Sequence, residues 1–122
     1  VVRGGLAMRR VIVESPYAAD TPEGIDRNVD YLRACIRDCL VRGEAPFASH
    51  AIYTQPGVLR DDVPGERKHG IEAGFAWREH ADATVVYMDR GVSMGMRYGV
   101  ADADRIGCPI EYRHLGGDWC ER

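Results

Sequence analysis

The chain has 122 residues, 45% hydrophobic and 29% charged, as expected for one globular domain that buries a core without metals or crosslinks. Its formal net charge of -3 gives no reason to expect binding to a nucleic acid polymer or to an anionic membrane. No apolar run approaches the ~20 residues of a membrane span, and the first residues lack the apolar stretch of a secretory signal. We therefore expect a cytoplasmic protein whose functional chain begins at Met8, with residues 1–7 a disordered extension or an expression remnant.

The four cysteines do not indicate disulfides or a metal centre. Cys35 and Cys39 stand four apart in a helical pattern, Cys108 precedes a proline at a strand start, and Cys120 lies in the tail. A zinc site at Cys35 and Cys39 would need two further ligands at suitable spacing, and none is evident. We expect free thiols, two of them core residues, and no metal or organic cofactor.

The chain begins with a strand pattern followed by a helix pattern. Residues 10–13 are largely β-branched and predict a buried strand that ends in the loop Glu14-Ser15-Pro16-Tyr17. Thr21 as N-cap and Pro22 in the first turn predict a helix start. Apolar residues at three-and-four spacing then continue this helix to Gly43.

A second strand, a long loop, a helix and a third strand follow. Residues 45–49 predict a weaker strand, with its proline tolerated near the strand start. Residues 50–63 form a loop of a length that is often functional in a compact domain. Residues 64–80 have helical spacing weakened by two glycines, and residues 84–88 predict a buried strand.

The segment after this third strand predicts an anion site. A polar loop over residues 89–93 contains Gly91 and opens a helix over Met94–Ile106, which a strand over residues 109–112 follows. A loop that opens a helix directly after a buried strand collects free backbone N–H groups and a positive dipole end, where a phosphate can bind. We therefore expect a nucleotide-sized ligand here, and an irregular tail over residues 114–122.

Strands and helices thus alternate as β-α-β-α-β-α-β. This order predicts an α/β fold, a three-layer Rossmann- or flavodoxin-like parallel sheet of about four to five strands with helices on both faces. Ligands in such folds bind outside the carboxyl ends of the strands, at the topological switch point. The polar groups expected to converge there are Glu14-Ser15-Pro16-Tyr17, Ser49-His50, Met88-Asp89-Arg90 and Tyr112-Arg113-His114.

The ordered set of motifs resembles the nucleoside 2-deoxyribosyltransferase and nucleotide N-glycosidase superfamily, most closely its small phage and bacterial domains. The counterparts are Ser15-Pro16-Tyr17, Ser49-His50, Ala81-Asp82 before Val85-Val86, Ser93-Met94-Gly95 and Gly107-Cys108-Pro109-Ile110. They cover most of residues 9–113, so we expect a nucleoside deoxyribosyltransferase-like domain over 8–115 and a tail over 116–122. The resemblance implies a small-molecule nucleoside or nucleotide as partner. It also implies a homodimer or larger assembly, which the apolar helix faces allow.

The resemblance also assigns residues to the last helix. The superfamily binds a 5′-phosphate with Ser and Gly groups at the start of this helix, and Ser93 and Gly95 match that pattern. About one turn later it carries a glutamate that attacks or supports the anomeric carbon. In this chain a gapless alignment on the hydrolase pattern places Gly99 there, and alignment on the transferase pattern places Arg97. Neither residue can be a nucleophile.

Glycosidic cleavage by this route needs a carboxylate near the anomeric carbon, and two acids are candidates for it. Glu14 ends a buried strand at the expected ligand edge, where partial burial would raise its pKa; alternatively it caps a loop or pairs with an arginine. Asp89 follows the third strand, and its alternative role is helix N-capping. Glu44 precedes a strand at the opposite edge and is expected to be structural.

The remaining site residues are predicted to bind substrate. His50 would contact a base or phosphate, or be a surface residue, and Tyr17 and Tyr53 would stack on a base or pack against the sheet edge. Arg90 and Arg97 would neutralise a phosphate, or simply be exposed. The full predicted binding set is Ser15, Tyr17, His50, Tyr53, Arg90, Gly91, Ser93, Gly95 and Arg97.

Three functions are consistent with this set. The first is cleavage or transfer at the N-glycosidic bond of a nucleoside 5′-monophosphate or deoxynucleoside. In it the phosphate would lie on the loop 91–95, the sugar near Glu14 and Asp89, and the base under Tyr17 and the loop 50–55. The second is a non-catalytic nucleotide-binding or sensing module that has lost the glutamate. The third is an interaction protein with a vestigial pocket.

Overall fold

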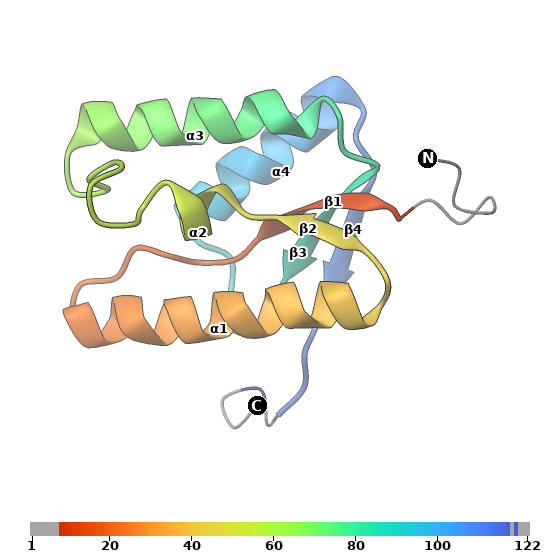
Figure 1. Ribbon diagram of the computed structural model, residues 1–122, viewed down its shortest axis with the longest axis horizontal. Coiled ribbons are helices and arrows are strands. Elements are labelled where there is room, and N and C mark those ends of the chain that lie inside the picture. The colour runs from red at the N-terminus through yellow and green to blue at the C-terminus, as the bar shows by residue number, and fades with distance from the viewer. Residues whose placement is uncertain (1–7, 118, 120–122) are drawn as a thin grey trace.

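The computed structural model describes residues 8–117 and 119, and it contains a four-stranded parallel sheet in the order β2-β1-β3-β4. This confirms the predicted three-layer α/β fold, with α1 on one face and α3 and α4 on the other (Figure 1). The elements in chain order are β1 (Arg10–Glu14), α1 (Pro22–Val41), β2 (Ala45–Phe47), α2 (Ser49–Ile52), α3 (Pro64–Arg78), β3 (Ala83–Tyr87), α4 (Met94–Ile106) and β4 (Ile110–Arg113).

The pleat of β1 gives the two faces of the sheet different chemistry. Val11 and Val13 point toward α1 and join a core cluster that includes Leu32 and Cys35 of that helix. Glu14 lies on the opposite face, where its carboxylate accepts a hydrogen bond from the guanidinium of Arg78 in α3. The α1 side of β1 therefore packs into an apolar core, and its other side carries a buried charge at its carboxyl end.

Helix boundaries follow the capping residues where these exist. The Thr21 hydroxyl accepts a hydrogen bond from the N–H of Gly24 at 3.0 Å, as predicted for the start of α1. The Ser93 hydroxyl caps α4, and Gly107 ends it with φ of 74°, in the left-handed region that glycine tolerates. Both bounds of α4 are as predicted.

The main departure from the predicted elements is α2, which lies in a segment expected to be a strand end and a loop. Its N-cap, Ala48, makes no side-chain capping bond, so the sequence carries no start signal. The Thr54 hydroxyl and the Gln55 amide instead satisfy carbonyls of this short helix, those of His50 and Ala51.

Three further expectations concern the cysteines, the termini and membrane spans. Cys35 and Cys39 are buried core thiols, as predicted. The expected extension over residues 1–7 lies outside the described residues, as do residue 118 and residues 120–122 of the tail. Within the described part of the chain, no helix has the length and apolarity to cross a membrane.

Candidate functional site

A cavity of about 100 Å³ lies at the carboxyl end of β1, between the start of α2 and the first turn of α4. Six of the residues predicted from the sequence line it: Glu14, Ser15, Tyr17, His50, Ser93 and Gly95. The rule that parallel strands present their ligand sites at the carboxyl edge thus brings together residues up to 81 positions apart, from position 14 to position 95.

Glu14 is held from one side only. Its Oε2 accepts a hydrogen bond from Nη2 of Arg78 at 2.8 Å, and Oε1 has no hydrogen-bond partner among the described residues. Burial raises the pKa of this carboxyl to about 7, against the attraction of the Arg78 guanidinium, which lowers it. Near neutral pH the group is therefore divided between its charged and neutral forms.

Gly99 of α4 explains how a carboxylate from β1 fits beneath that helix. A Cβ built on Gly99 would lie well inside van der Waals contact with both carboxylate oxygens of Glu14. The Glu14 carboxyl group therefore fills the space that any side chain at position 99 would occupy. Position 99 is one of the two at which alignment expects the superfamily's glutamate.

Ser15 and His50 form a hydrogen-bonded pair in the same cavity. The Ser15 hydroxyl and Nε2 of His50 are 2.8 Å apart, and Ser15 is buried. Burial without a carboxylate partner lowers the pKa of His50 to about 4. The imidazole is therefore neutral at pH 7, and it offers hydrogen bonds rather than charge to a ligand.

The first turn of α4 closes the cavity on another side. The Ser93 hydroxyl accepts from the N–H of Met96 at 3.3 Å, so the capping role and the predicted binding role fall on one residue. Gly95 borders the cavity without a side chain to narrow it. Ser93 and Gly95 thus place the positive end of a 13-residue helix at the cavity.

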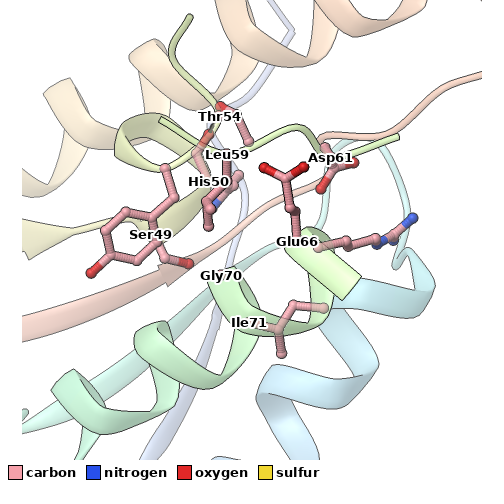
Figure 2. A pocket seen from close by; sticks show the side chains of 10 residues that line it. Ser49, His50, Thr54, Leu59, Asp61, Glu66, Gly70 and Ile71 are labelled. Carbon is pink, nitrogen blue, oxygen red and sulfur yellow. Dashed lines mark hydrogen bonds between the residues drawn. The ribbon is translucent and has the colours of Figure 1, made fainter. Parts of the chain in front are cut away.

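A second, smaller cavity of about 60 Å³ adjoins the first and shares Ser49 and His50 with it. Figure 2 shows the carboxylates of Asp61 and Glu66 facing this space opposite His50. Tyr53, predicted either to stack on a base or to pack, also lines this cavity, and its hydroxyl accepts from the indole of Trp77 at 3.1 Å, which favours the packing role.

Arg67 is the principal residue that the sequence did not single out. It borders both cavities, it is half-buried, and its guanidinium makes no hydrogen bond or ion pair with another described residue. The signal that could have identified it is spacing. Arg67 stands four and eight residues before Ile71 and Phe75, on the predicted inner face of its helix.

Four predicted site residues lie elsewhere. The Asp89 carboxylate accepts from the Tyr31 hydroxyl at 2.6 Å and from the N–H groups of Leu115 and Gly116, which lowers its pKa. It neither lines the cavity nor caps α4, whose N-cap is Ser93. The other three residues outside the cavity are Arg90, which donates to Asn28, Gly91 in an exposed turn, and exposed Arg97.

Comparisons with known proteins agree with this fold. A family model described as a domain of unknown function (DUF7768) matches residues 9–113. No curated protein matches the chain. Among solved structures, the chain is similar to the 2-deoxyribosyltransferase of Bacillus psychrosaccharolyticus, with a TM-score of 0.59 and 16% identity over 88% of this chain and 74% of that chain. At that identity the likeness shows a shared fold.

Proposed function

The chain belongs to the DUF7768 family of domains of unknown function, and we propose that it cleaves or transfers at the N-glycosidic bond of a nucleoside 5′-monophosphate or deoxynucleoside. The observation that carries this proposal is the Glu14 carboxylate in the space beside Gly99, with one oxygen that has no hydrogen-bond partner in the described part of the chain. The shared fold with a 2-deoxyribosyltransferase supports a nucleoside as the substrate class.

Cleavage of an N-glycosidic bond by this route needs a carboxylate close to the anomeric carbon. Positive charge develops at the anomeric carbon as the bond to the base breaks, and a nearby carboxylate stabilises that charge or bonds to the carbon. In the superfamily that this chain resembles, the carboxylate comes from the helix equivalent to α4. Here Glu14 of β1 would supply it from the next element, because Gly99 leaves the space empty.

The proposed reaction uses only Glu14, the substrate, water and, in a transfer, a second base. The free oxygen of Glu14 forms a bond to C1′ while the C1′–N bond breaks, and the base leaves with the bonding pair and takes a proton from water. A second water, or a second base in a transfer, then attacks C1′, gives its proton to the hydroxide that the first water left, and releases the carboxylate. His50 is not the proton donor in this scheme, since its pKa of about 4 keeps it neutral.

The remaining residues would hold the substrate. A 5′-phosphate would lie at Ser93 and Gly95, where the N-terminus of α4 and the guanidinium of Arg67, which no described residue pairs, both favour an anion. Tyr17 and neutral His50 would then contact the sugar or the base. Arg67 takes the neutralising role that the sequence suggested for Arg90 and Arg97.

Release of free base tests the proposal. The protein is incubated with a panel of nucleoside monophosphates and deoxynucleosides, with and without an acceptor base, and products are separated by chromatography. We expect base release that Glu14→Gln abolishes while nucleotide binding persists. Glu79→Gln, at an exposed carboxylate after α3, is the matched control and should retain activity. Full activity in Glu14→Gln would remove Glu14 from the mechanism.

One observation favours the second function, a non-catalytic nucleotide sensor. Arg78 already pairs with Glu14 at 2.8 Å, as it would in a purely structural ion pair. A sensor would bind a nucleotide in calorimetry, and it would release no base from any member of the same panel. The two measurements together separate a glycosidase, a sensor and a chain with a vestigial pocket.

A further inference from the structure

Arg78 connects the candidate site to a buried charge network beneath it. It lies at the end of α3 with 2% of its surface exposed. Its guanidinium donates to three acceptors from three different elements: Oε2 of Glu14 at 2.8 Å, Oδ2 of Asp102 at 3.0 Å and Oγ1 of Thr84 at 2.6 Å. A planar guanidinium bound in this way has one orientation, so the carboxylate that it holds has one as well.

We propose that Arg78 is the positioning residue for Glu14, and that Asp102 limits how strongly Arg78 attracts the Glu14 carboxylate. This inference rests on the proposed function, because positioning matters only where Glu14 meets a substrate. Arg78 binds Oε2 of Glu14, which lines the cavity, and Oε1 has no hydrogen-bond partner among the described residues. Asp102 binds Nε of the same guanidinium and draws part of its charge away from Glu14.

Asp102 is itself held in place by a second cation. Its Oδ1 accepts from Nη2 of Arg105 at 2.6 Å, one turn further along α4, and Arg105 is largely exposed. The chain of contacts therefore runs from the solvent at Arg105 through Asp102 and Arg78 to the cavity at Glu14. Each link is a charge-assisted hydrogen bond, and these are stronger and more directional than neutral ones.

The other groups around Glu14 are neutral, or are charged groups that do not contribute to the shift of its pKa. Thr84 of β3 bonds Arg78 without adding charge, and Gly99 of α4 adds no side chain. His50 is neutral through burial, and Arg67 and Asp61 line the same cavity but are not among the groups that shift the pKa of Glu14. Arg78 and Asp102 are therefore the two charges packed closest to Glu14, and they act on it with opposite signs.

This opposition gives a test that a purely structural role would fail. Arg78→Lys removes the planar fork and should raise the midpoint of the Glu14 titration. Asp102→Asn keeps the shape, frees the charge of Arg78 for Glu14, and should lower that midpoint by on the order of one pH unit. Asp38→Asn removes a carboxylate on the α1 face, whose hydrogen bonds go to Tyr87 and Arg42, and should leave the midpoint unchanged.

The midpoint is read by NMR from the side-chain carboxyl carbon of Glu14 in the ligand-free protein, assigned by its loss in Glu14→Gln. The pH profile of kcat/KM for base release should shift in the same direction as each midpoint. Shifts of opposite sign in the two variants support the inference. Equal or absent shifts overturn it, and if Arg78→Lys does not fold, an unchanged or higher midpoint in Asp102→Asn overturns it alone.

The two proposals fail in different ways. If no substrate releases base, the glycosidase proposal fails, while the ligand-free titration still decides whether Arg78 and Asp102 control Glu14. If base is released and the midpoints do not move, the function stands and the positioning role of Arg78 is wrong.

Discussion

Two buried arginines, one on each face of the sheet, each bind a glutamate, but they bind it in different ways. Arg113 on the α1 face binds both oxygens of Glu44 at 2.7 Å, and its other contacts include Glu111 and the Tyr87 hydroxyl. This bidentate pair is closed, because each carboxylate oxygen of Glu44 has an arginine donor and the carboxylate is 7% exposed. Glu44 is structural, as its position in the sequence predicted.

Arg78 on the α3 and α4 face holds its glutamate by one oxygen only. It divides its donors among Glu14, Asp102 and Thr84, so Oε1 of Glu14 has no hydrogen-bond partner among the described residues, and Glu14 lines a cavity. A glutamate held by both oxygens can only stabilise the fold. A glutamate held by one is oriented and can still react, and this difference separates a structural ion pair from a candidate catalytic one.

The largest predicted effect contrasts these two glutamates directly. Glu14→Gln should lower the rate of base release by about 10³-fold, since it removes the carboxylate proposed to meet the anomeric carbon. Glu44→Gln should leave activity per folded molecule near wild type, while it lowers the free energy of unfolding by about 3–5 kcal/mol because Arg113 loses its buried partner. Steady-state kinetics and urea unfolding measure the two losses, and the contrast fails if both variants lose mainly stability.

The raised pKa of Glu14 should make the free energy of unfolding depend on pH. The carboxyl titrates near 4.5 when unfolded and near 7 when folded, so the unfolded state loses its proton first as pH rises. The protonated Glu14 carboxyl therefore contributes fully to the free energy of unfolding below pH 4.5. This contribution is lost as the pH rises to 7, and it amounts to about 3 kcal/mol.

Comparing the wild-type protein with Glu14→Gln isolates the contribution of Glu14 to the pH dependence of stability. His50 has the opposite dependence, because its pKa falls from 6.5 to about 4 on folding and stability is lost as pH falls through that range. The difference in unfolding free energy between wild type and Glu14→Gln cancels the His50 contribution. Denaturant unfolding from pH 4 to 8 should show this difference decreasing as pH rises, and a flat difference would contradict the assigned burial.

Gly99→Ala tests whether Glu14 can take its position only because residue 99 has no side chain. The added Cβ would meet both carboxylate oxygens, so Glu14 must move away from Arg78. We expect base release to fall by about 100-fold and stability to fall by about 1–3 kcal/mol from overpacking. Gly65→Ala is the matched control, since a Cβ there meets nothing within 4 Å. Unchanged kinetics in Gly99→Ala would mean that the position of Glu14 is not important.

The fold was largely predictable because its signals are local. Helix α4 was predicted with both bounds because Ser93 caps it and Gly107 ends it, and strand alternation with helices implies a parallel sheet. The short α2 was missed because a four-residue helix without a capping side chain resembles a loop in sequence.

The site was only partly predictable, since the direction of a loop depends on distant partners. Glu14, Ser15 and His50 are fixed by strand ends, and the structure brings them together as the topology requires. Asp89 also follows a strand, but it is drawn to Tyr31 of α1 and to the tail, 58 and 26 positions away. No sequence pattern marks a contact over such separations.

The smallest predicted effect concerns Arg67, a cation at the cavity that the sequence did not single out. Arg67→Gln should raise KM for a nucleoside monophosphate about tenfold, equal to about 1.4 kcal/mol of binding, and should leave KM for the deoxynucleoside unchanged. Lys68→Gln is the control, because Lys68 is the exposed neighbour of Arg67 on α3 and does not border the cavity of Glu14. Equal losses on both substrates would assign Arg67 to the sugar or base, and the phosphate would then lie elsewhere. A selective loss would show that the α3 and α4 face has both an oriented carboxylate, Glu14, and a cation that no described residue pairs, Arg67. On the α1 face, Arg113 and Glu44 are paired with each other.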